Sequence, residues 1–195
     1  MASMGAGAMT AVSPRIYGAV VPVVAALGEV VAESRSRTEL LARSIDVLAE
    51  ALGWPQGEAW VPNEDGLLHL APGTRSLTPA AGRFSRATAP LAFARGVGLP
   101  GLAWASGGVV VLDTLQSVPW YRRRAEAAGA GFDAAAAVAV ATDTALEFVL
   151  AFHGAAVPDA AACDLVLTVA AAQLRGCWTR LGATTSAVMS PRPEA

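Results

Sequence analysis

Apolar residues recur at helical spacing in the N-terminal part of the chain and again near its C-terminal end. From residue 41 to residue 52 a Leu or Ile stands at every third or fourth position, which predicts a helix with one apolar face. We expect two helices within residues 16–52, the second capped by Ser36 or Thr38 and ended by Gly53. A last helix is expected over residues 159–181, with an apolar arc wider than one packing face requires.

Short apolar runs separated by turn residues fill the middle of the chain and predict β-strands. Residues 56–61 and 67–71 flank an Asn-Glu-Asp-Gly turn, and residues 134–141 and 146–153 flank a Thr-Asp-Thr turn. Each pair therefore predicts a hairpin, and a further strand is expected over residues 109–113. Hairpins with helices at both ends favour an α+β fold with an antiparallel sheet.

Two segments between the predicted strands lack a regular spacing of apolar residues. Residues 72–90 combine Gly, Ser, Thr and Pro, which predicts a loop with one helical turn around Phe84. Residues 120–128 are expected to form a helix that is ended by Gly129 and Gly131. On this helix the consecutive residues 122–124, all Arg, would point about 100° apart, so at most one or two could reach a common site.

Length and composition indicate one folded core. The 195 residues are 54% hydrophobic and only 15% charged, which excludes general disorder. We expect a disordered N-terminus over residues 1–15, an N-terminal helix over 16–36, a folded domain over 37–182 and a disordered tail over 183–195.

The net charge and the cysteine content limit which partners and which cellular compartment are expected. The net charge of −2 gives no general attraction for nucleic acid, so none is expected as a partner. The apolar stretch 16–28 is shorter than the roughly 20 residues that span a bilayer, so no membrane contact is expected. Cys163 and Cys177 lie on one predicted helix, about 21 Å apart, too far for a disulfide. This favours a cytoplasmic protein.

The stretch from residue 95 to residue 113, RGVGLPGLAWASGGVVVLD, is the most specific motif of the chain. It combines turn glycines, a short helix, a Ser-Gly pair that ends this helix, and a buried strand that ends in Asp. This order resembles the central segment of GAF domains, which are small sensor modules, and the order of elements extends the resemblance over residues 38–181. The positions that carry it are Gly98, Leu99, Pro100, Gly101, Trp104, Ser106, Gly107, Asp113 and residues 127–129.

The resemblance implies an α+β fold with an antiparallel sheet of five to six strands. The N- and C-terminal helices would cover one face and often form a dimeric bundle, while loops and short helices would hold a ligand pocket on the other face. Two positions depart from the family pattern, because Ala139 stands where Pro is usual and Glu147 where Gly is usual. We expect these departures to change the shape of the pocket without changing the fold.

From this resemblance we expect a non-catalytic regulatory or sensor domain that binds an unidentified small molecule. It would signal through a homodimer of the terminal helices or through another protein partner. The pocket residues expected to bind the ligand are Trp60, Phe84, Phe93, Trp104, Asp113, Trp120, Tyr121 and Arg122. Two other interpretations stay open: a dimerisation scaffold without ligand, in which aromatic side chains fill the pocket, and a thiol-dependent redox enzyme that uses Cys163 or Cys177.

Several cofactors and activities known for GAF domains lack their residues here. Both cysteines lie on the last predicted helix, whereas bilin attachment and the free methionine sulfoxide reductases require cysteines near the pocket. His69 and His153, the only imidazoles, are interpreted as exposed strand-end residues. They do not form a zinc site, which needs three or four ligands, and haem through one axial His stays open as a cofactor. No catalytic residue and no metal site are expected.

Overall fold

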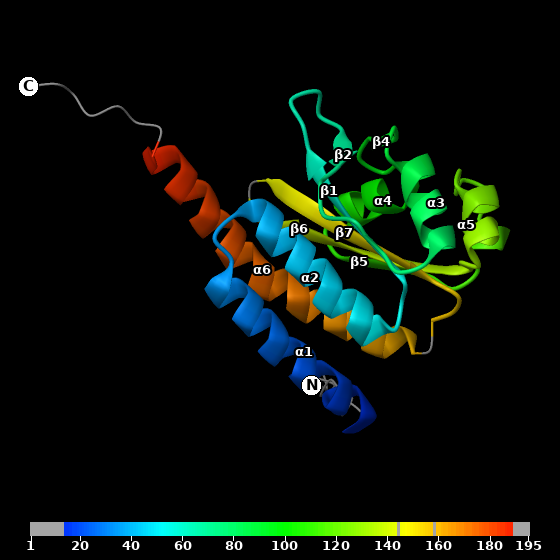
Figure 1. Cartoon of the computed structure of the whole chain (residues 1–195), viewed down its shortest axis with the longest axis horizontal. Coiled ribbons are helices and arrows are strands. Elements are labelled where there is room, and N and C mark those ends of the chain that lie inside the picture. The colour runs from blue at the N-terminus through cyan, green and yellow to red at the C-terminus, as the bar shows by residue number, and fades with distance from the viewer. Residues whose placement is uncertain (1–13, 144, 158, 189–195) are drawn as a thin grey trace, which may run out of the picture.

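Three long helices form a layer on one face of a sheet in the computed structural model, which describes residues 14–188 except 144 and 158 (Figure 1). They are α1 (Pro14–Glu33), α2 (Arg37–Leu52) and α6 (Ala160–Val188). Helices α2 and α6 lie on the sheet, and α1 packs against both of them. Leu27 and Val30 of α1 are buried in this contact.

The predicted boundaries of α2 are confirmed, whereas α1 begins earlier and α6 ends later than expected. Ser36 caps α2, because its Oγ accepts a hydrogen bond from the backbone N–H of Glu39 at 3.1 Å. Gly53 ends α2 in the left-handed region. Residues 14–15 and 183–188 belong to α1 and α6, so both helices extend further than expected. The rest of the two expected disordered ends lies outside the described residues.

The sheet has seven strands in the described part of the chain, and every strand pair is antiparallel. The order is β4-β2-β1-β7-β6-β5, with β3 paired to β1. The α+β prediction and both hairpins are confirmed, while β3 and β4 are two-residue strands that carry no sequence period. The strands are β1 (Gln56–Pro62), β2 (Leu68–Leu70), β3 (Arg75–Ser76), β4 (Ala92–Phe93), β5 (Val109–Leu112), β6 (Ala134–Ala141) and β7 (Leu146–Gly154).

The alternation of side chains along β6 and β7 divides the core into two halves. Val138 and Phe152 belong to the half under the long helices, while Ala137 and Ala151 belong to the half under the short helices. The small alanine side chains on this second face let α4 (Gly98–Ser106) pack close to the sheet. The candidate site lies on this second face.

A second helical layer covers this face (Figure 1) and consists of α3 (Pro79–Thr88), α4 and α5 (Arg124–Ala130). A 3-10 turn over residues 115–117 lies between β5 and α5 in the chain. Helix α3 corrects the expectation of a loop over residues 72–90. Its start is well formed, because Thr78 Oγ1 accepts a hydrogen bond from the N–H of Ala81 at 3.0 Å and Pro79 occupies the first turn. The sequence therefore contained a start signal for this helix.

Helix α5 begins later and ends later than expected. Residues 120–123 form a turn before the helix, and of the two glycines expected to end it, Gly131, at φ 76°, does so, while Gly129 lies within the helix. The 100° separation of successive helical side chains does not apply to a turn. Arg122 and Arg123 can therefore both face the same site.

One helix in the described part of the chain has the length and composition of a membrane span, α6 over residues 160–182. Leu167, Ala170 and Leu174 of this helix are fully buried in the core under the sheet. Packing inside the domain accounts for these apolar residues. The expected cytoplasmic location stays a prediction.

Candidate functional site

A buried ion pair lies between the sheet and the layer of short helices. Arg123 Nη1 donates hydrogen bonds to Glu58 Oε1 at 3.0 Å, to Glu58 Oε2 at 3.2 Å and to Thr88 Oγ1 at 2.6 Å. The Arg123 side chain is 5% exposed and the Glu58 side chain is fully buried. Since Glu58 lies on β1, Thr88 at the end of α3 and Arg123 in the turn before α5, this pair fastens both segments to the sheet.

Neighbouring side chains on β1 complete the hydrogen bonding of the Glu58 carboxylate. Gln56 Nε2 donates to Oε1 at 3.4 Å and Trp60 Nε1 donates to Oε2 at 3.2 Å. These three residues alternate along the strand and so share one face. A buried carboxylate is tolerated only when it is paired and hydrogen-bonded, and Glu58 meets both conditions.

Aromatic rings surround the Arg123 guanidinium. Its central carbon lies 4.6 Å from the ring centre of Phe84, 5.9 Å from that of Phe93 and 6.0 Å from that of Trp60, distances typical of cation–π contacts. Burial acts to lower the pKa of Arg123, but the charge of Glu58, with smaller contributions, holds it above its ordinary value. The guanidinium therefore stays charged inside this aromatic shell.

His153 is fully buried in this cluster, so its interpretation as an exposed residue is wrong. Its Nε2 lies 3.5 Å from Arg123 Nη2, and its Nδ1 has no hydrogen-bond partner among the described residues. Burial, and then the positive charge of Arg123, hold the pKa of His153 well below its ordinary value, so the ring is neutral. His69 is exposed as expected and contacts Asp65 at 2.7 Å.

Acidification below about pH 6.5 is expected to destabilise the protein through His153. The unfolded chain takes up a proton at the ordinary histidine pKa and the folded chain does not, so the free energy of unfolding falls by up to about 1.4 kcal/mol per pH unit. The loss stops once the pH reaches the lowered pKa of the folded state. Urea unfolding between pH 7 and pH 5 should give a shallower slope for His153→Phe. An unchanged slope in His153→Phe would contradict the assignment.

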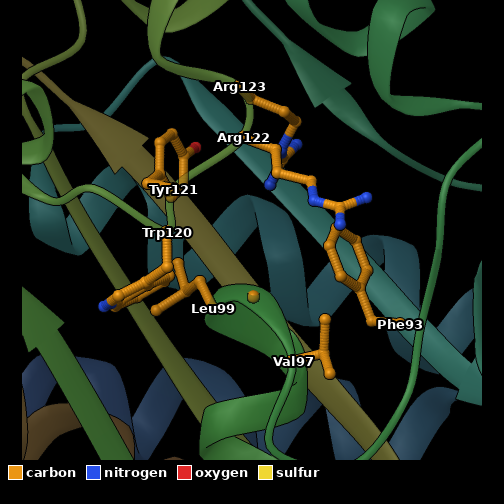
Figure 2. Close-up of a pocket in the computed structure, with 8 residues that line it drawn as sticks. Phe93, Val97, Leu99, Trp120, Tyr121, Arg122 and Arg123 are labelled. Atoms are coloured by element: carbon orange, nitrogen blue, oxygen red, sulfur yellow. The ribbon is translucent and has the colours of Figure 1, made fainter.

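A narrow niche opens beside the ion pair, between the start of α4 and the turn before α5 (Figure 2). Its free volume is about 20 Å³, which is room for about one water-sized group. A wider hollow of about 530 Å³ adjoins it, within the usual range for small-molecule sites. The niche is lined by Phe93, Val97, Gly98, Leu99, Trp120, Tyr121, Arg122 and Arg123, and the hollow by Gly96, Val97, Gly98, Leu102, Pro119, Trp120 and Arg122.

Tyr121, one of the residues that line the niche, carries a buried hydroxyl without a partner among the described residues. Tyr121 is buried, and its hydroxyl makes no hydrogen bond with any described residue. Burial raises the pKa of this phenol far above its ordinary value, so the hydroxyl remains a donor. Figure 2 shows Arg122 and Phe93 on one side of the niche and Trp120 and Leu99 on the other.

The structure brings together half of the residues expected to bind a ligand. Phe93, Trp120, Tyr121 and Arg122 line the niche, whereas the other four lie elsewhere. Trp60 and Phe84 are buried beneath it in the core, Trp104 is half-buried outside both the niche and the hollow, and Asp113 is exposed beyond β5.

Sequence reasoning missed the buried polar cluster of Glu58, Thr88, Arg123 and His153. One signal was available in the sequence. Gln56, Glu58 and Trp60 occupy alternate positions of one strand, so a charged side chain lies on the same strand face as a Trp. Neither the niche nor the hollow is lined by a histidine, so they offer no axial imidazole to haem. The described residues contain no cluster of three or more His, Cys, Asp or Glu suited to a metal.

Comparison with known proteins defines the class of the fold. No protein-family profile and no curated protein matches the chain. Among solved structures, the free methionine-R-sulfoxide reductase from Neisseria meningitidis, in complex with its substrate, has a TM-score of 0.69 at 22% identity over 89% of this chain and 95% of that chain. The GAF domain of a Coxiella burnetii phosphoenolpyruvate-protein phosphotransferase has a TM-score of 0.70 at 17% identity, covering 87% of this chain and 98% of that one.

A putative GAF sensor protein from Burkholderia vietnamiensis is similar over 86% of this chain and 98% of that chain, with a TM-score of 0.67 and 12% identity. The chain is therefore an α+β domain with a GAF-like fold, as its central motif predicted. At these identities the similarity extends to the fold alone, so function has to be argued from the site.

Proposed function

We propose that this chain is a non-catalytic regulatory GAF domain that binds a small molecule in the niche and the adjoining hollow. The observation that carries the proposal is the buried hydroxyl of Tyr121, a residue that lines the niche, which has no hydrogen-bond partner among the described residues. An unsatisfied buried donor costs about 1–3 kcal/mol, and a ligand acceptor in the niche would remove that cost. The hollow of about 530 Å³ provides room for the rest of the ligand.

Binding would be transmitted through the buried ion pair. Arg123 belongs to the turn that lines the niche and is held by Glu58 on β1, and β1 packs against α2 on the opposite face. A ligand that binds better to one position of this turn shifts the population of the domain towards that position. The outer layer of long helices, where Val21 of α1 is 62% exposed, is the proposed surface for a second copy in a homodimer or for a signalling partner.

Native mass spectrometry and an absorption spectrum of protein purified from its host without refolding test the proposal. A bound small molecule, released on unfolding, would support it and show the chemical class of the ligand. Protein that carries no bound mass and binds none of the compounds named in the next section would contradict it.

A ligand-free dimerisation scaffold is the second candidate, and one observation favours it. The Arg123 guanidinium and its aromatic shell fill the space between the sheet and the short helices, leaving only about 20 Å³ in the niche. In that case native mass spectrometry would detect an empty dimer. A Trp120→Ala variant would then dimerise as the unmodified chain does.

A thiol-dependent redox enzyme is the third candidate, suggested by the similarity to methionine sulfoxide reductases. Cys163 and Cys177 lie on α6, in the core half under the long helices and on the other face of the sheet from the niche. Burial raises the pKa of Cys163 to about 11, so its thiolate fraction at pH 8 is roughly 100-fold below that of an ordinary thiol.

We expect no thiol-dependent reduction of free methionine sulfoxide by this chain. The double variant Cys163→Ser with Cys177→Ser should keep its fold by circular dichroism, and its ligand binding should be unchanged. Measurable reductase turnover in the unmodified chain, lost in the folded double variant, would establish the redox enzyme in place of the sensor.

A further inference from the structure

The geometry points to a small organic anion as the ligand: a carboxylate attached to an apolar group. Its carboxylate would contact Arg122 and the Tyr121 hydroxyl, and its apolar part would lie against Trp120 in the hollow. This inference rests on the proposed function and specifies the ligand class of the same site.

The charge of the site favours an anion. Two arginines line the niche, and none of the described residues that line the niche or the hollow is acidic. The charge of Arg123 is balanced by Glu58, whereas no ion pair to Arg122 is found among the described residues. Arg122 therefore leaves an uncompensated positive charge at the mouth of the niche, and guanidinium groups bind carboxylates with paired, charge-assisted hydrogen bonds.

Tyr121, which also lines the niche, carries a buried donor. Its hydroxyl has no partner among the described residues, and burial keeps the phenol protonated by raising its pKa. A carboxylate oxygen in the niche would accept its hydrogen bond. A cationic group would bring only further donors towards Arg122 and Tyr121, and would leave the hydroxyl hydrogen of Tyr121 without an acceptor.

The sizes of the niche and the hollow set the orientation of the ligand. About 20 Å³ admits a single small group, so a ring or branched chain has to stay in the hollow. There Trp120 is 43% exposed and Val97 is 47% exposed, two of the four large hydrophobic residues that are exposed in the described part of the chain. Covering them by an apolar group removes that surface from water.

Three matched phenyl compounds test the ligand class: phenylacetate, phenylacetamide and the phenethylammonium cation. Titrations followed by protein-detected NMR at low salt should give a dissociation constant for phenylacetate about tenfold lower than for the amide, with still weaker binding of the cation. Arg122→Gln should weaken phenylacetate about tenfold. Arg124→Gln is the matched control, because Arg124 is exposed on the adjacent helix and lines neither the niche nor the hollow.

Tyr121→Phe separates ligand binding from a structural role. The variant should bind phenylacetate several-fold more weakly, while the unfolding temperature of the ligand-free protein stays the same or rises, because an unpaired buried hydroxyl is removed. A hydroxyl that supported the fold would instead lower the unfolding temperature on removal.

The anion assignment is overturned by amide or cation binding as tight as that of phenylacetate, by an Arg122→Gln variant with unchanged affinity, or by no phenylacetate binding at about 10 mM. A neutral or cationic molecule found in the purified protein would overturn this inference and leave the proposed function standing. The proposed function itself fails only when the purified protein is empty and all three compounds fail to bind.

Discussion

Replacing Glu58 with Gln is expected to lower the free energy of unfolding by about 3–5 kcal/mol. The substitution keeps the shape of the side chain and removes its charge, so the Arg123 guanidinium remains buried without a counterion. Removing one partner of a buried pair costs more than the pair contributes, because the remaining charge stays desolvated. Urea unfolding followed by tryptophan fluorescence measures the change.

Two controls make this expectation specific to the buried pair. The Asp46–Arg75 ion pair has a similar distance of 2.8 Å, but Asp46 is 61% exposed, so Asp46→Asn should cost no more than about 1 kcal/mol. The double variant Glu58→Leu with Arg123→Met removes both charges and should regain part of the loss; the rest remains because Gln56 Nε2 and Trp60 Nε1 lose their acceptor. A Glu58→Gln variant as stable as Asp46→Asn would mean that the pair is solvated.

The Glu58–Arg123 pair also links stability to ligand binding. Arg123 follows Tyr121 and Arg122 in the turn that lines the niche, so its attachment to β1 fixes the position of both groups that we propose to contact the ligand. Loss of the attachment should weaken phenylacetate binding even under conditions in which the Glu58→Gln variant is fully folded. The double variant is expected to bind weakly as well, because it regains part of the stability without regaining this attachment.

The parts of the fold that were predicted correctly are those with local causes. Ser36 and Gly53 mark the ends of α2 through contacts within a few residues, and the turn residues of the two hairpins lie between the strands that they join. The GLPG turn likewise places the start of α4 at Gly98. In each case the residues that determine the structure are neighbours in the sequence.

The buried polar cluster could not be predicted because its members are far apart in the chain. Glu58 and Arg123 are 65 residues apart, and Arg123 and His153 are 30 apart. A run of three arginines is more often a solvated surface, and only the turn before α5 brings one of them onto the sheet. His153 was misread because a residue at the end of a strand was assumed to be exposed, whereas the second helical layer covers it.

Gly101→Ala is expected to be the most damaging change within the GLPG motif. A Cβ at Gly101 would collide with the backbone carbonyl oxygen of Ala94, in a loop whose Gly96 N–H donates to the Gly101 carbonyl at 2.7 Å. Because backbone cannot move aside as a side chain can, the substitution should cost about 1–3 kcal/mol or more.

The same change should damage the proposed ligand site. To admit the methyl group, the loop before α4 has to move, and this loop carries Val97 and Gly98 of the niche. Gly108→Ala is the control, since a Cβ there meets nothing within 4 Å, and it should be neutral or slightly stabilising. Urea unfolding and phenylacetate titration of both variants measure the two effects. If Gly101→Ala loses stability but keeps its affinity, the loop before α4 supports the fold without shaping the niche, and ligand recognition would then depend on the turn before α5 alone.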